Sequence, residues 1–318
     1  MASTLRDIAK ACGKDISTVS RALRGDDRVR QATRHEVEAV AVRLGYVPNL
    51  SARSLAGART KTIWYLIPNI KDPVQIHGVQ EASRYLAEKG YEQSIILYQN
   101  DAQRYMHLLS RLSQGVTDGA IIVPEPVGRR EDQLQDLVDQ KFPVVLFDRH
   151  PEKLTIPTVT SDNAGASAEM ARMLIEQGAK RFVVLFNNYH NAVEQARFKG
   201  AVEHLAAAGV PFVLKENFEP SFLVLNETLG VIANSQLSVR KFTQEHLTAA
   251  QPHCVAVFDD WQGDPYPAIQ AIVCTQNLTA MARRACDLVL DMIEGTFPVE
   301  NMHRIPPLNF NTFDTQVQ

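Results

Sequence analysis

The chain has 318 residues, of which 45% are hydrophobic and 22% are charged, a composition typical of a globular protein with two or three structural units. A membrane-spanning helix needs about 18–20 consecutive apolar residues, and no run approaches that length. Charged residues, among them Arg6 and Lys10, interrupt the region where a secretory signal would need an apolar stretch. The four cysteines have no C-x-x-C spacing and are typical of reduced thiols. We therefore expect a cytoplasmic protein without a disulfide or zinc framework.

The charge is distributed unevenly along the chain. Residues 1–61 contain 12 Lys and Arg against 6 Asp and Glu, a balance of +6. The remainder contains 21 basic and 30 acidic residues, a balance of −9. A small basic head on an acidic body indicates that the head binds a polyanion, and the alternative is a merely solvated basic segment.

The first 46 residues have the pattern of three short helices. Thr4 can cap a helix that ends at Gly13, a residue suited to a left-handed turn. Asp15 can cap a second helix over residues 16–23, and a third helix follows over residues 31–44. Two short helices joined by a tight glycine turn and supported by a third predict a helix-turn-helix.

The second of these helices carries side chains suited to reading DNA at its N-terminal end. Ile16 can pack on a thymine methyl group, and Ser17 and Arg21 can hydrogen-bond to base edges in the major groove. The residues expected to contact backbone phosphates are Thr18, Ser20, Arg24 and Arg34. The alternative is a generic three-helix bundle with a polar face.

Three stretches of the head carry a family resemblance. Residues 4–13 (TLRDIAKACG), 17–25 (STVSRALRG) and 44–55 (LGYVPNLSARSL) resemble, in order and spacing, the head of the lactose-repressor (LacI/GalR) family. The resemblance implies a DNA-binding domain over residues 1–46, with Thr4 and Leu5 also near the DNA. The family usually has Gly-Val-Ser at the turn, whereas this chain has Gly13-Lys14-Asp15.

Residues 47–60 follow as a linker. Pro48 disfavours helix before it, and residues 50–56 could form about two helical turns, too short to be stable alone. The resemblance implies that this is the family's hinge helix, which pairs with its dimer mate and enters the minor groove. Leu55 would wedge a base step open, with Asn49, Ala52 and Arg53 alongside. The alternative is a flexible linker.

From Thr62 onward, short β-rich runs alternate with amphipathic helical stretches, a pattern that predicts parallel sheets covered by helices on both faces. The predicted strands are 63–67, 94–98, 120–123, 144–147, 182–186, 231–233 and 255–258. The predicted helices include 80–89, 105–114, 164–177, 192–208 and 278–294. These units are too many for one modest sheet and favour two doubly wound parallel-sheet subdomains. We expect the N-terminal one to comprise residues 61–160 with 277–300, and the C-terminal one 161–276 with 301–318.

The body also resembles the family, although more weakly. The matching segments are 67–69, 116–122, 162–166, 197–200, 231–234 and 258–260. The family's body is similar to periplasmic sugar-binding proteins, and it dimerises and holds a small effector between its two halves.

An effector with many hydroxyl groups or a negative charge needs converging polar groups, which the ends of parallel strands provide. Arg197 is the strongest candidate, because it matches the family arginine that binds effector oxygens and a guanidinium suits two neighbouring hydroxyls or a carboxylate. The alternative for Arg197 is a surface ion pair with Glu194 or Glu203. The full predicted set is Asn69, Asp72, Tyr98, Asp148, Tyr189, Arg197, Ser235 and Asp260.

The chain departs from the family at this predicted site. The family has Asn-Asp where this chain has Asn234-Ser235, so one hydroxyl replaces a carboxylate. The segment 72–78 is about three residues short, and 215–229 omits most of a helix. These differences predict one of three outcomes: a reshaped pocket, a pocket that prefers a different ligand, or a pocket that has no function.

No catalytic motif is present: the sequence has no G-x-S-x-G elbow, no Gly-rich phosphate loop with Lys-Ser/Thr and no H-E-x-x-H. We expect no enzyme, no metal site and no cofactor. We expect instead a transcription regulator, and specifically a repressor, that acts as a homodimer or tetramer at the bacterial nucleoid. It would bind double-stranded operator DNA under the control of a sugar or sugar phosphate. The alternatives are a cytoplasmic sugar-binding or sugar-processing α/β protein and a regulator controlled by a protein partner.

Overall fold

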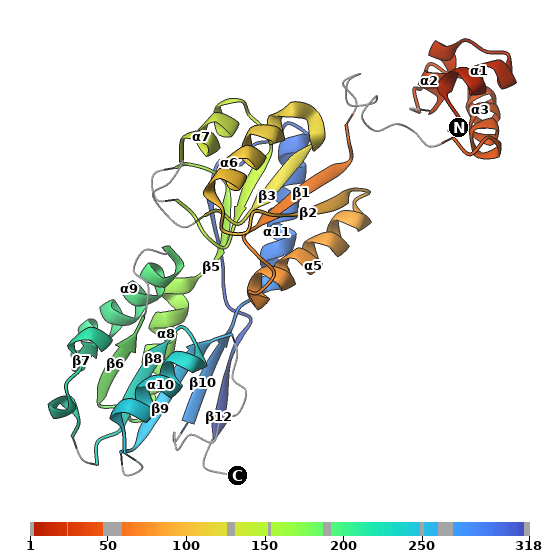
Figure 1. The fold of residues 1–318 in the computed structure, drawn as a ribbon. Coiled ribbons are helices and arrows are strands. Elements are labelled where there is room, and N and C mark those ends of the chain that lie inside the picture. The colour runs from red at the N-terminus through yellow and green to blue at the C-terminus, as the bar shows by residue number, and fades with distance from the viewer. Residues whose placement is uncertain are drawn as a thin grey trace. The chain divides into compact units, whose positions relative to one another are not determined.

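A computed structural model describes residues 3–23, 25–46, 59–125, 131–151, 154–186, 192–224, 226–248, 251–259 and 270–314. The chain divides into two compact units, Met1–Thr60 and Lys61–Gln318. We call the first unit the head and the second the body (Figure 1). Elements carry the labels of that figure.

Within residues 3–46, the described part of the head contains the three predicted helices: α1 (Leu5–Cys12), α2 (Ile16–Leu23) and α3 (Gln31–Arg43). Thr4 and Asp7 cap α1 reciprocally, because the Thr4 backbone N–H donates to the Asp7 carboxylate at 2.8 Å and the Asp7 N–H donates to the Thr4 hydroxyl. Gly13 ends α1 in the left-handed conformation with φ 60°. The apolar faces of the three helices close one small core around Ile8, Val19 and Val37.

The first half of the body, the first lobe, contains a six-stranded sheet in the order β11-β5-β4-β3-β1-β2, and every pairing in it is parallel. Its strands are β1 (Thr62–Ile67), β2 (Glu92–Leu97), β3 (Gly119–Ile122), β4 (Val144–Phe147), β5 (Thr158–Ser161) and β11 (Met302–Ile305). Its helices are α5 (Pro73–Glu88), α6 (Ala102–Arg111), α7 (Glu131–Asp139) and α11 (Leu278–Ile293). Helices α5 and α11 cover one face of the sheet, and α6 and α7 cover the other (Figure 1).

The second lobe repeats this plan in the order β12-β10-β9-β8-β6-β7, with only β12 antiparallel to its neighbour among these described strands. Its strands are β6 (Arg181–Leu185), β7 (Phe212–Leu214), β8 (Leu229–Ala233), β9 (His253–Phe258), β10 (Gln270–Thr275) and β12 (Asn309–Asp314). Its helices are α8 (Asn163–Glu176), α9 (Ala192–Ala207) and α10 (Gln236–His246). The predicted architecture of two doubly wound parallel sheets is therefore confirmed.

The chain passes between the lobes at three crossovers. The first joins β5 to α8 at residues 161–163, the second joins β10 to α11 at residues 276–277, and the third joins β11 to β12 at residues 306–308. The expectation that residues 301–318 all belong to the second lobe is wrong for residues 302–305. These residues form β11 of the first sheet, since they pair with β5 and the Asn301 carbonyl accepts the Thr158 N–H at 2.7 Å. Strand β5 likewise extends the first lobe to Ser161.

The body also differs from the expected elements in detail. Strands β5, β7, β10, β11 and β12 are additional to the predicted set. Helix α6 starts three residues earlier than predicted and gives way to a π-helical turn (Leu112–Val116), in which Gly115 has φ 75°. In the described parts of the chain, no helix is both long and apolar enough to cross a membrane.

Candidate DNA-reading head and effector pocket

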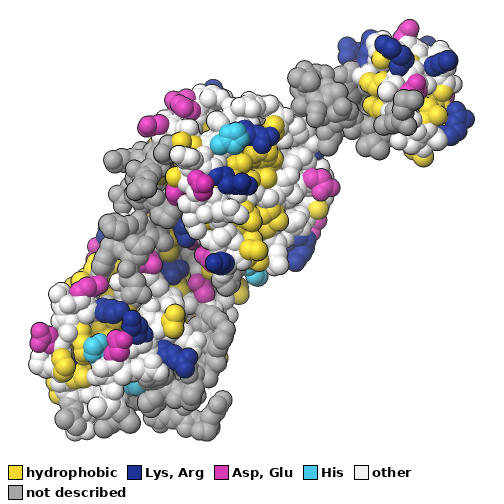
Figure 2. All heavy atoms as spheres, viewed as in Figure 1, with side chains coloured by type: hydrophobic (Ala, Val, Ile, Leu, Met, Phe, Trp, Pro, Cys, Tyr) yellow, Lys and Arg dark blue, Asp and Glu magenta, His cyan; other side chains and the backbone are white. Residues whose placement is uncertain are grey.

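The N-terminal end of α2 presents the side chains predicted to read DNA. Ser17 and Arg21 are exposed, and Ile16 keeps 45% of its surface exposed although it is a large apolar residue. Val19 and Ala22, on the opposite side of the helix, are fully buried. The helix therefore offers a polar face with one accessible aliphatic side chain, and Lys and Arg side chains are spread over the visible face of the head (Figure 2).

The residues predicted to contact phosphates differ in how far they are exposed and in their partners. Thr18 and Ser20 are half-buried on α2. Arg34 is held inside the head, because its Nη2 donates to the carbonyl oxygens of Gly25 and Asp26, each at 3.0 Å. The same nitrogen lies 3.6 Å from a carboxylate oxygen of Asp27. The phosphate roles of these side chains remain predictions.

Three basic residues that the sequence analysis did not single out lie beside α2. Arg6, Lys10 and Lys14 line a shallow hollow together with Thr18. Their spacing of four residues places Arg6 and Lys10 on one face of α1. That spacing is the signal that could have identified Arg6 and Lys10 as candidate phosphate contacts.

Several predicted residues lie outside the described part of the chain. These are Arg24, the hinge residues Asn49, Ala52, Arg53 and Leu55, and the effector candidates Tyr189 and Asp260. The roles of these residues stay predictions.

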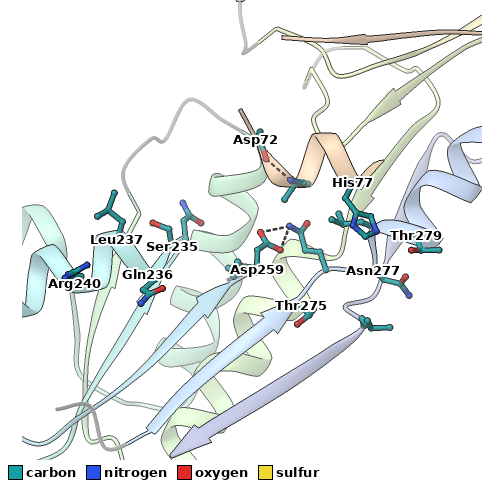
Figure 3. A pocket seen from close by; sticks show the side chains of 16 residues that line it. Asp72, His77, Ser235, Gln236, Leu237, Arg240, Asp259, Thr275, Asn277 and Thr279 are labelled. Atoms are coloured by element: carbon teal, nitrogen blue, oxygen red, sulfur yellow. Dashed lines mark hydrogen bonds between the residues drawn. The ribbon is translucent and has the colours of Figure 1, made fainter. Parts of the chain in front are cut away.

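The body contains a pocket of about 910 Å³ that is lined by residues from both lobes (Figure 3). The start of α5, the β8–α10 turn, the end of β9 and the β10–α11 crossover all contribute side chains. The pocket thus lies at the carboxyl ends of parallel strands, where such sheets bind ligands. The lining includes Asp72, His77, Asn234, Ser235, Leu237, Arg240, Phe258, Asp259, Gln276 and Leu308.

Two of the predicted effector residues, Asp72 and Ser235, line the pocket, and both also cap helices. The Asp72 carboxylate accepts the Val74 N–H at 3.0 Å at the start of α5. The Ser235 hydroxyl accepts the Ser238 N–H at 3.4 Å at the start of α10. The two helix N-termini therefore point toward the pocket, and each adds a partial positive charge to its wall.

The prediction for Tyr98 is wrong. This side chain is fully buried in the first lobe, where its hydroxyl donates to the Val123 carbonyl at 3.1 Å and its ring packs against Tyr105. Its place directly after β2 indicated a strand-end polar group, but the ring turns into the core between the sheet and α6. Asn69 also contributes no surface to the pocket, because its carboxamide oxygen accepts the Lys71 N–H at 2.8 Å in a local turn.

Arg197 lies directly behind the pocket wall and is 6% exposed. Its Nε donates to the Asn163 carboxamide oxygen at 2.8 Å, and its Nη1 donates to that of Asn234 at 3.4 Å. Its guanidinium stacks 3.6 Å above the ring of Phe258, which lines the pocket. The other reading was a surface ion pair with Glu194 or Glu203, and it is wrong in that Arg197 is buried. Glu203 pairs with Lys199, whereas the charge of Glu194 is among those that favour the charged form of Arg197.

Two aspartates with matching backbone geometry face Arg197 from the two lobes. Asp148 directly follows β4, Asp259 directly follows β9, and both have φ 69°, a left-handed conformation that aspartate tolerates. The side-chain nitrogen Nε2 of Gln276 donates to both carboxylate oxygens of Asp259, each at 2.8 Å (Figure 3). Asp148 is buried, and an oxygen of its carboxylate lies 3.7 Å from Arg149 Nε.

Burial is the main influence on the pKa values of Asp148 and Arg197. It raises the pKa of Asp148 to about 6, against the opposing attraction of Arg149 and Arg197, and the carboxylates of Asp72 and Asp259 raise it further. Burial lowers the pKa of Arg197, while Asp259 and Asp148 favour its charged form. The wall behind the pocket thus holds charges of both signs, and burial works against the charged forms of Asp148 and Arg197.

We expect Asp148→Asn to stabilise the body at neutral pH. Because the folded-state pKa of Asp148 lies above its ordinary value of 3.8, the native protein loses stability as the pH rises from about 4 to about 6. The full loss is about 3 kcal/mol for a pKa near 6. Urea unfolding at pH 4 and pH 7 should therefore show the two chains equally stable at pH 4 and the variant more stable at pH 7. Asp132→Asn, at an exposed site on α7, controls for the loss of a surface charge, and equal stability at both pH values would contradict the prediction.

The sequence analysis missed Gln276 and Asn163, although both follow strand ends. Gln276 follows β10, which was not among the predicted strands. Asn163 lies in a family-matching segment, and only the fold shows that it contacts Arg197.

Comparison with known proteins finds a matching protein family for each of the two units. Residues 4–49 match the family of bacterial regulatory proteins described as the lacI family. Residues 63–287, more than half of the chain, match the periplasmic binding protein domain. The chain belongs to the LacI family. It therefore joins a family of DNA-binding transcription regulators built from the two units described above.

Individual LacI-family relatives are similar over different lengths. The HTH-type transcriptional regulator RegA of Clostridium saccharobutylicum is 32% identical, over 57% of this chain and 54% of RegA, so that match spans about half of the relative. The sucrose operon repressor of Klebsiella pneumoniae is 26% identical over 96% of each chain. The Lac repressor dimer bound to operator and an anti-inducer has the same fold, with a TM-score of 0.77 over 99% of each chain at 17% identity.

Two of the departures expected from the LacI-family resemblance can be located in the structure. Between β7 and β8, where a helix was expected to be mostly missing, the chain forms two single 3₁₀ turns, Lys215–Asn217 and Pro220–Phe222. Ser235 caps α10 at the edge of the pocket. This LacI-family pocket therefore has one carboxylate fewer at the β8–α10 turn than the family pattern predicts.

Proposed function

We propose that the chain is a sequence-specific DNA-binding transcription regulator, acting as a repressor, whose operator affinity depends on a small effector held in the body pocket. The observation that carries the proposal is the exposed face of α2, where Ile16, Ser17 and Arg21 stand clear of the head's core. A recognition helix needs this arrangement to place short polar, cationic and methyl-contacting groups in the major groove.

We further propose that the effector is a sugar or sugar phosphate. The pocket supports this because it combines hydrogen-bonding groups, such as Asp259 and Asn234, with apolar surface from Phe258 and Leu237. Similarity over nearly the whole chain to a protein named as a sucrose operon repressor also supports a sugar as the effector. Effector binding across two lobes would shift the population of lobe arrangements and thereby the affinity for DNA, typically by about 5–150-fold.

We propose that the working form is a homodimer, or a tetramer built from it. A two-fold protein suits a near-palindromic operator, with one head on each half-site. The hinge residues Asn49, Ala52, Arg53 and Leu55 would then contact the minor groove between the half-sites. The DNA-bound protein would lie at the bacterial nucleoid.

The test begins with duplexes selected from a random library by the full chain. A thermal-shift screen of sucrose, hexoses, pentoses and their phosphates then identifies compounds that raise the melting temperature. We expect at least one such compound to change the dissociation constant for the selected duplex. If the chain enriches no duplex, the regulator proposal is wrong. If it enriches a duplex but no compound changes its binding, the effector proposal is wrong.

A further inference from the structure

Gln276 connects the pocket to the interior of the body. Its side chain is 6% exposed, and its Nε2 donates to both carboxylate oxygens of Asp259 at 2.8 Å. Its Oε1 accepts the hydroxyl of Ser161 at 2.5 Å. Ser161 is 4% exposed and also contacts the sulfur of Met281 on α11 at 3.3 Å.

These bonds leave the Gln276 amide a single favourable orientation. A carboxylate only accepts hydrogen bonds, so the amide nitrogen must face Asp259 and the amide oxygen must face the Ser161 hydroxyl. Turning the amide over would place its oxygen against two carboxylate oxygens. The position of the Asp259 carboxylate is therefore tied to that of Ser161.

The two ends of this chain of bonds lie on different crossovers. Ser161 ends β5 and leads into the first crossover, whereas Gln276 directly follows β10 and forms the second. Any rearrangement of the lobes must alter the backbone at these segments, because all of the chain that links the lobes passes through the crossovers. Asp259, in contrast, belongs to the pocket wall.

We propose that Gln276 is a positioning residue that holds the Asp259 carboxylate in the pocket and links it, through Ser161, to the first two crossovers. The proposal rests on the pocket being the effector site. A ligand hydroxyl that binds Asp259 then acts on a group already connected to the segments about which the lobes move. Gln276 transmits occupancy of the pocket and need not touch the ligand.

The ligand-free test is a titration of the Asp259 carboxyl by carbon-detected NMR in the full chain. The charged groups that face this carboxyl are Arg197 on α9, Asp72 before α5 and Asp148 after β4. Gln276→Leu removes two donated hydrogen bonds, so we expect the titration midpoint to move to higher pH. Ser161→Ala keeps Gln276 but releases its oxygen, and we expect a smaller move in the same direction.

The matched control is Gln135→Leu. It breaks another Gln–Asp pair, in which Gln135 donates to Asp139 at 2.8 Å on the exposed side of α7. We expect this variant to leave the Asp259 midpoint unchanged. A purely structural role for Gln276 would lower stability without moving the midpoint, and an unchanged midpoint in both Gln276→Leu and Ser161→Ala would overturn the proposal.

The coupling test uses sucrose as the probe. It measures the ratio of duplex dissociation constants with and without sucrose, for which couplings of about 5–150-fold are typical. We expect Gln276→Leu and Ser161→Ala to bring this ratio close to one, while Gln135→Leu retains it. An undiminished ratio in both Gln276→Leu and Ser161→Ala would overturn the link to the crossovers. Failure of sucrose to affect the unmodified chain would count against sucrose as effector, and the carboxyl titration would still decide the role of Gln276.

Discussion

Replacing Arg197 with lysine is expected to weaken effector binding and, as a result, the effector response of duplex binding. The guanidinium makes two directed hydrogen bonds, to Asn163 and Asn234, while it stacks on Phe258. A lysine ammonium lacks the planar fork and cannot make both bonds and the stack together. Each hydrogen bond to a charged group contributes about 1.5–3 kcal/mol, so we expect at least about a tenfold loss of affinity for any compound that binds the pocket.

Calorimetric titration of the variant with a compound identified by the thermal-shift screen measures this effect. Lys199→Ala is the matched control, because Lys199 lies on the same helix with 70% of its side chain exposed. Urea unfolding of the variant separates a loss of binding from a loss of folding. Lysine keeps a positive charge near Asp148 and Asp259, which Arg197→Ala would remove, so we expect the lysine variant to fold. A lysine variant that bound and responded like the unmodified chain would show that Arg197 has no role in effector recognition.

Gly200→Ala is expected to destabilise the second lobe by about 3 kcal/mol or more. A Cβ atom at this position would lie 2.0 Å from the carbonyl oxygen of Ala164 and 2.7 Å from its carbonyl carbon. Both are backbone atoms of α8, so no side-chain rotation relieves the clash and the two helices must separate. Overpacking in a core usually costs about 1–3 kcal/mol, and a clash with a rigid backbone lies at the upper end of that range or above it.

The same substitution should weaken the effector site. Ala164 neighbours Asn163, the hydrogen-bond partner of Arg197, so separating α8 from α9 lengthens that contact. Urea unfolding measures the stability, and the adjacent exposed position again provides the control through Lys199→Ala. A Gly200→Ala chain as stable as the control would mean that the two helices pack less closely than described.

The head was predictable because its signals are local. Thr4 and Gly13 mark the ends of α1, and both have the capping conformations expected of them. The third helix, predicted over residues 31–44, is α3 (Gln31–Arg43), and its Val37 and Val40 lie in the core of the head. Within a short helical unit, the residues that decide the structure are close together in the chain.

The strands of the body were only partly predictable. Long apolar runs such as β1 and β9 are evident because both faces of their sheets are covered. Strand β5 (Thr158–Ser161) and strand β12 (Asn309–Asp314) are rich in polar residues, and they form through pairing with strands distant in sequence. No local pattern distinguishes such segments from loops.

The candidate site was predictable in position and less so in its side chains. The rule that ligands bind at strand ends led to Asp72, Ser235 and the region of Asp259. It also led to Tyr98, which is in the core, because a strand end does not fix which way the last ring turns. The Ser161–Gln276 bond joins residues 115 positions apart, and only the tertiary structure reveals it.

The most direct test of the central claim, that the head reads a duplex, is the salt dependence of binding to the selected duplex. The logarithm of the association constant should fall linearly with the logarithm of the salt concentration, with a slope that corresponds to several neutralised phosphates. Arg21→Ala should reduce the magnitude of the slope by about one and weaken preference for the selected sequence. Binding that does not change with salt would contradict the account. So would an Arg21→Ala variant with the same salt slope and the same sequence preference as the unmodified chain.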